Sequence, residues 1–111
     1  MTDVEFDYTE VLKTDTSDVV VNVVAHQTIS NSPLRAVLWS SLHHAWIFAP
    51  GPAARLLYDD RNFDRLRGID RATAERAARE QLQKELPSEA ELQTICDEGE
   101  RMGWDNGPPR R

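Results

Sequence analysis

Two stretches near the start of the chain show the pattern of β-strands. From Val4 to Tyr8 apolar and acidic residues alternate strictly, which predicts a strand with one buried and one solvated face. Residues 19–25, VVVNVVA, consist mainly of β-branched side chains, which suit a pleated surface better than a helix. Because this second stretch is apolar on both faces, we expect a central strand, with Asn22 as a satisfied polar group within it. The polar segment 13–18, KTDTSD, is typical of the turn between the two strands.

Residues 34–46 fit two structures. In the first, Ser32 caps a helix with Pro33 in its first turn, and the apolar residues recur at helical spacing. In the second, residues 41–44 form the turn of a hairpin that places each apolar position opposite another, with Trp39 facing Trp46. We favour the hairpin because Trp, Ile, Val and Phe prefer strands. The turn sequence SLHH counts against it, since it lacks the Gly or Asn that tight turns favour.

After Pro50 the pattern becomes helical. A helix that opens at Gly51 and Pro52 would end near residues 59–62 and would place four residues on one side: Ala53, Leu56, Leu57 and Asp60. Residues 61–69 could form a loop or a further helical turn. We expect their three apolar side chains to reach the core: Phe63, Leu66 and Ile69.

Two further helices are predicted in the last third of the chain. Asp70 caps a helix over residues 71–85 that carries a narrow stripe of alanines. Ser88 and Glu91 form a capping box at the start of the last helix, which Gly103 is placed to end. The apolar side of that helix comprises Leu92, Ile95, Cys96, Gly99 and Met102. A short proline-rich tail follows from about residue 104.

These elements predict one α+β domain over residues 1–111. We expect an antiparallel sheet of about four strands, made of two sequential hairpins, followed by two to three helices packed on one face of the sheet. A chain of 111 residues is too short to enclose two separate cores.

Charge and cysteine content narrow the function. The net charge of −6 is concentrated at the two ends of the chain, around a mildly basic middle. This argues against nucleic-acid binding, which needs a continuous positive face, and it suits a partner with a basic surface. The first residues lack the pattern of a secretory signal, and no apolar run is long enough to span a membrane. With a single cysteine, Cys96, we expect a cytoplasmic protein.

No catalytic or cofactor motif is present, and His43 and His44 are the first candidates for chemistry. Adjacent side chains diverge, and no zinc-ligand spacing accompanies them, so we expect neither a metal site nor a cofactor. With a carboxylate from Asp59 or Asp60, either imidazole could perform acid–base catalysis. That combination defines the alternative function, a small enzyme or ligand-binding domain.

The tryptophans suggest a contact surface. In the hairpin, Trp39 and Trp46 share one face of the sheet with Val37 and Phe48. If the helices cover this face, the tryptophans are core residues. If the face is open, they form the aromatic centre of a protein interface. Trp104, beyond the last helix, is a further anchor.

We therefore predict a small acidic, non-catalytic protein that binds another protein. Its most concrete forms are an inhibitor or immunity-type protein and an accessory subunit of a larger complex, and a homo-oligomer is also compatible with the sequence. The predicted contact residues are Trp39, His43, His44, Trp46, Asp59, Asp60 and Trp104.

Overall fold

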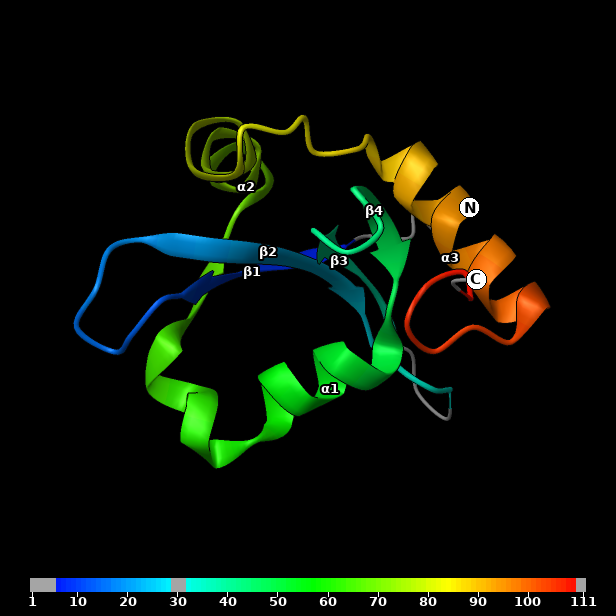
Figure 1. Cartoon of the computed structure of the whole chain (residues 1–111), viewed down its shortest axis with the longest axis horizontal. Helices are drawn as coiled ribbons and strands as arrows, with labels where there is room; N and C mark the ends of the chain where they lie inside the picture. Colours follow the sequence, from blue (N-terminus) through cyan, green and yellow to red (C-terminus); the bar gives the residue numbers. More distant parts are fainter. Residues whose placement is uncertain (1–5, 29–31, 110–111) are drawn as a thin grey trace.

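A computed structural model describes residues 6–28 and 32–109 of the chain (Figure 1). It contains five strands, three α-helices and two shorter helical turns. The strands are β1 (Asp7–Leu12), β2 (Val20–Gln27), β3 (Arg35–Ser40), β4 (Ala45–Phe48) and β5 (Leu66–Ile69). The helical elements are α1 (Pro50–Tyr58), the 3₁₀ turn η1 (Asp60–Arg65), α2 (Arg71–Ala77), the π-helical turn η2 (Ala78–Leu82) and α3 (Glu89–Met102).

The strands form one antiparallel sheet in the order β4-β3-β2-β1-β5. The predicted α+β class and the two sequential hairpins are confirmed, with β2 at the centre of the sheet. The sheet has five strands rather than about four. No helix within the described residues has the length and apolar character that crossing a membrane requires.

Helices cover both faces of the sheet, so the prediction that they pack on one face is wrong. Figure 1 shows α1 on one side of the sheet and α2 and α3 on the other. The two cores divide neighbouring residues between them, because successive side chains of a strand point to opposite faces. Val23 and Val37 pack with α2 and α3, whereas Val24 and Leu38 pack against α1. Two apolar faces on the central strands therefore required a helical layer on each.

The hairpin formed by β3 and β4 replaces the helix that residues 34–46 could also have formed. Trp39 pairs with Trp46 and Val37 with Phe48, as the cross-strand pattern predicted. Residues 41–44 form the turn, in which His44 has a φ of 52°. His44 thus adopts the left-handed conformation that Gly or Asn usually supplies, which is how SLHH closes the hairpin.

Asn22 joins β2 to β3 where their regular pairing stops. Its Nδ2 donates to the carbonyl of Trp39 at 2.9 Å, and its Oδ1 accepts from the Trp39 amide at 3.1 Å. The carboxamide therefore acts in place of a strand backbone, and the expectation of a satisfied polar group is confirmed.

The first strand lies later in the chain than predicted. Positions 4 and 5 lie outside the described residues, and β1 covers Asp7–Leu12. The alternation is correct where it can be compared, since Phe6 and Tyr8 are buried and Asp7 is exposed. The strand continues through Glu10, a buried carboxylate whose Oε2 lies 2.6 Å from a guanidinium nitrogen of Arg67 on β5.

Residues 61–69 form η1 and then β5, and the strand was not predicted. β5 is a short edge strand with exposed Arg67 and Gly68 at its centre, so it carries little of the usual strand pattern. Leu66 and Ile69 are half-buried against the two cores as expected. Phe63 is 72% exposed, so the expectation that it reaches the core is wrong.

The predicted boundaries of the later helices are confirmed at three points. The side chain of Asp70 accepts from the Thr73 amide, and Ser88 and Glu91 form the complete capping box. Gly103 ends α3 with a φ of 72°, which favours glycine. Met102, expected on the apolar side of α3, is half-exposed at 51%.

Candidate functional site

The two hairpin tryptophans pack against each other across β3 and β4. Their ring centroids are 5.7 Å apart in an edge-to-face arrangement, and both rings are half-buried. They lie on the face of the sheet that α2 and α3 cover, so the hypothesis of an open face is wrong. The ammonium of Lys84 lies 5.2 Å from the centroid of the Trp39 ring, which covers this tryptophan further.

His43 fastens the C-terminal tail to the hairpin. Its Nε2 lies 2.9 Å from the carbonyl oxygen of Pro108, and its Nδ1 lies 2.9 Å from the Ser40 hydroxyl. Because a carbonyl can only accept, Nε2 carries the hydrogen and Nδ1 accepts from Ser40. Both ring nitrogens are thus engaged. His44 is exposed at the turn.

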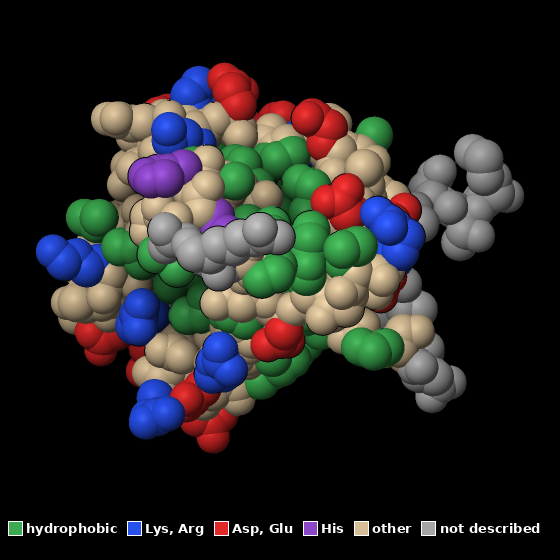
Figure 2. All heavy atoms as spheres, turned by 45° about the vertical axis from the view of Figure 1, so that its right-hand side comes forward, with side chains coloured by type: hydrophobic (Ala, Val, Ile, Leu, Met, Phe, Trp, Pro, Cys, Tyr) green, Lys and Arg blue, Asp and Glu red, His purple; other side chains and the backbone are tan. Residues whose placement is uncertain are grey.

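His43, Trp46 and Trp104 meet at one pocket, which we call the Trp pocket. It has a volume of about 260 Å³ and is lined by residues that include His43, Trp46, Phe48, Ile95, Glu98 and Trp104. Figure 2 brings the α3 side of the molecule forward and shows hydrophobic side chains gathered in the middle of this face, with histidine beside them and both acidic and basic side chains around them. Three of the predicted contact residues therefore share one site.

The tail forms one wall of the Trp pocket because it folds back onto β4. The Trp104 amide donates to the Gly99 carbonyl at 2.9 Å, which completes the end of α3. The Gly107 amide donates to the Phe48 carbonyl at 2.8 Å. Together with the bond from His43 to Pro108, these contacts hold the tail against the outer edge of the sheet.

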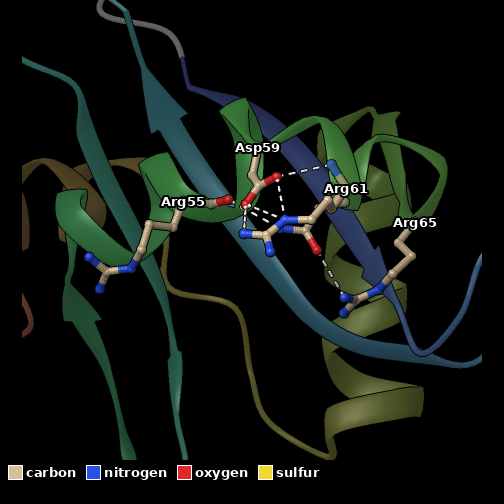
Figure 3. Close-up of polar contacts among 5 residues, drawn as sticks. Arg55, Asp59, Arg61 and Arg65 are labelled. Carbon is tan, nitrogen blue, oxygen red and sulfur yellow. Dashed lines mark hydrogen bonds and ion pairs between the residues drawn. The ribbon is translucent and has the colours of Figure 1, made fainter.

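Asp59 and Asp60 lie elsewhere, at the junction of α1 and η1. The carboxylate of Asp59 accepts from the backbone amide of Arg61 at 3.0 Å and binds the Arg61 guanidinium at 2.7 Å (Figure 3). These hydrogen bonds from Arg61 lower the pKa of Asp59 to about 2. Asp60 is exposed. Among the described residues, no hydrogen bond or ion pair joins either carboxylate to His43 or His44.

The described side chains also form no cluster of metal ligands. Within residues 6–28 and 32–109, no group of three or more His, Cys, Asp or Glu side chains could hold an ion. Cys96 is fully buried beside Arg35, and burial raises the pKa of its thiol.

A second surface, which we call the η1 surface, was not predicted. It consists of Tyr58 and Phe63, exposed by 63% and 72%, and a groove of about 370 Å³ that both line. Leu57, Leu66, Thr9 and His26 also line the groove. The sequence contains one signal for it, the Asp59 and Arg61 pair that fixes the turn, but nothing that marks Phe63 as exposed.

The turn that presents Phe63 is held at both ends. Asp59 caps it at the start, and Asn62 donates to the Arg55 carbonyl at 3.1 Å. At its end, the Arg65 guanidinium donates to the Leu12 carbonyl and to the Asn62 side chain, each at 3.0 Å. Figure 3 shows the labelled side chains of this network. Phe63 is thus held outside the core by polar contacts on both sides.

The polar end of this groove contains His26 and Thr9. The His26 Nε2 lies 3.0 Å from the Thr9 hydroxyl, and Nδ1 is buried with no hydrogen-bond partner among the described residues. Burial lowers the pKa of His26, against a smaller opposing effect of Asp7. The imidazole is therefore neutral near pH 7 and can donate or accept one further hydrogen bond.

Comparison of the chain with protein-family models, with curated proteins and with solved structures found no match. Any functional assignment therefore has to be argued from the geometry of the Trp pocket and the η1 surface.

Proposed function

We propose that this chain is a partner-binding protein that acts by contact rather than by catalysis, as an inhibitor or immunity-type protein or as an accessory subunit. The observation that carries the proposal is the exposure of Phe63 and Tyr58 beside the groove of the η1 surface. Large aromatic side chains are enriched among the residues that dominate protein–protein binding energy. A protein that keeps two of them in water next to a groove has a surface suited to a partner.

The η1 surface is preorganised for binding. Asp59, Asn62 and Arg65 fix the turn through hydrogen bonds, so Phe63 needs little ordering when a partner arrives. Ordering a loop or a side chain on association lowers affinity, and a turn that is already fixed avoids most of that cost.

The charge of the chain favours a basic partner. A net charge of −6 attracts a positively charged protein over distances of about a Debye length, which raises the association rate more than the final affinity. The attraction comes from the acidic ends of the chain, because the η1 surface itself lies in the mildly basic middle. An enzyme or toxin with a basic surface is the partner class that this overall charge favours.

The competing hypothesis, an enzyme or ligand-binding domain that uses His43 or His44 with Asp59 or Asp60, gains no support from the geometry. Both nitrogens of His43 bind other groups, and the Asp59 carboxylate is engaged by Arg61.

The test is capture of partners from the native cells with a tagged chain, in parallel with the variants Phe63→Ser and Tyr58→Ser. We expect each substitution to reduce the recovered partner about tenfold or more, because a central aromatic contributes about 2 kcal/mol or more to such an interface. Leu42→Ser is the matched control, since Leu42 is 59% exposed in the β3–β4 turn and should leave binding unchanged.

Circular dichroism and thermal unfolding establish that all three variants fold. Equal recovery with Phe63→Ser, Tyr58→Ser and the Leu42→Ser control would contradict the proposal.

A further inference from the structure

The Trp pocket has a composition that differs from that of the η1 surface. Its walls carry the half-buried rings of Trp46 and Trp104, and Glu98 is the one acidic or basic side chain, histidine aside, among its described lining residues. The face of an indole ring is negative and attracts cations, as does a carboxylate. We propose that the Trp pocket binds the cationic end of a lysine or arginine side chain that a partner protein presents.

Glu98 is available for such a cation because it has no partner among the described residues. The neighbouring carboxylates of α3 are already used. Asp97 and Glu100 lie 2.7 and 3.3 Å from the guanidinium of Arg35, and Glu89 accepts from the Tyr8 hydroxyl at 2.8 Å. A cation in the Trp pocket would therefore meet a carboxylate that pairs with none of the described residues.

An anion does not fit the same pocket. Its described lining residues include no lysine or arginine, and the Nε2 hydrogen of His43 is engaged by the Pro108 carbonyl. A purely apolar side chain would fill the space but would bury its surface next to the Glu98 carboxylate. A basic side chain satisfies both parts of the site, because its alkyl stem packs against Ile95 while its charged end meets Glu98.

The groove continues along α3 beyond the Trp pocket. A second hollow, lined by Ala90, Glu91, Thr94 and Ile95, shares the last two residues with the Trp pocket. The Glu91 carboxylate accepts from the Ser88 amide at 3.1 Å in the capping box. Among the described residues that line these two hollows, Glu98 is therefore the carboxylate left for a cation.

The test uses the NMR signals of the indole N–H groups of Trp39, Trp46 and Trp104. The full chain is titrated with Nα-acetyl-lysine amide, whose side-chain ammonium is free. It is titrated separately with Nα-acetyl-norleucine amide, which has an uncharged side chain of similar length. We expect saturable shifts of the Trp46 and Trp104 signals with the lysine probe, at least threefold stronger binding than with norleucine, and weaker binding at high salt.

The variant Glu98→Gln should weaken lysine binding at least threefold, whereas Glu85→Gln should not, because the exposed Glu85 lies before α3 and outside the lining of the pocket. Trp104→Leu removes an aromatic ring from the pocket and should also weaken lysine binding. All variants are checked for unchanged backbone spectra away from the pocket.

Equal affinity for the two probes, or lysine binding that is unaffected by Glu98→Gln, would overturn the proposal. A chain that ends at Pro109 is titrated alongside. If the shortened chain binds lysine markedly more tightly, Arg110 and Arg111 of the full chain are the occupants of the pocket. That result would overturn the assignment to a partner. Binding at the Trp pocket is measured with a small probe. A negative result there therefore leaves open whether a partner binds the η1 surface, and the two proposals can fail separately.

Discussion

His26 is a half-buried titratable side chain whose surroundings favour its neutral form. It lies on the α1 face of β2, hydrogen-bonded to the Thr9 hydroxyl. Removal from water lowers its pKa below the usual 6.5, and the carboxylate of Asp7 offsets this only in part. The folded state therefore takes up a proton at this site less readily than the unfolded chain does.

This difference predicts how stability depends on pH. Well above pH 6.5 His26 is neutral in both states and contributes no pH dependence. As the pH falls through 6.5, the unfolded chain binds the proton first, so the free energy of unfolding decreases. We expect the free energy of unfolding, measured with urea between pH 8 and pH 5, to decrease less for His26→Gln than for the native chain as the pH falls.

His44→Gln is the control for this experiment, because it removes a histidine that is exposed in the β3–β4 turn. Parallel profiles for His26→Gln and the native chain would contradict a half-buried His26 whose folded-state pKa is lowered.

Single residues were hardest to predict from sequence where their contacts come from distant parts of the chain. Glu10 is buried because Arg67, 57 residues later, pairs with it across β1 and β5. Phe63 is apolar yet exposed, because polar contacts of the neighbouring residues fix its turn. The sequence singled out His43 and Trp104 as site candidates, and both line the Trp pocket. Their meeting depends on the path of the tail, which no local pattern indicates.

At the scale of elements, local pairing made the hairpin predictable and distant pairing hid β5. The strands β3 and β4 are adjacent in sequence, and each apolar position has its partner no more than 11 residues away. By contrast, β5 pairs with β1 across most of the chain, and Gly68 interrupts its pattern. The caps of α2 and α3 were predictable because each depends on two residues three positions apart.

Gly99 shows how closely α3 approaches the sheet. A Cβ at this position would overlap the ring of Phe48 on β4. Replacing glycine with alanine in an exposed helix stabilises a protein by about 1 kcal/mol. Here we expect Gly99→Ala to destabilise the fold by about 1–3 kcal/mol, as overpacked core substitutions do, measured by urea unfolding.

Gly68→Ala is the matched control, since no atom lies within 4 Å of its added Cβ and a change within about 0.5 kcal/mol is expected. If Gly99→Ala stabilised the chain, α3 would not pack against Phe48 as described.

At the scale of the whole molecule, the sheet separates the two candidate surfaces. The η1 surface borders the layer that contains α1, whereas the Trp pocket lies on the side of α3 (Figure 1). The wrong prediction that all helices pack on one face also affected the functional prediction. It allowed the other face of the sheet to be open and to present aromatic side chains to a partner. With both faces covered, the candidate contact surfaces lie at the turn after α1 and beside the tail.

The central claim is that Phe63 contacts a partner. A photoreactive phenylalanine analogue placed at position 63, and in separate chains at positions 58 and 42, tests this most directly when the chains are illuminated in the native cells. The account predicts one defined crosslinked product from positions 63 and 58 and none from position 42. Crosslinking from position 42 alone, or from none of the three, would contradict it.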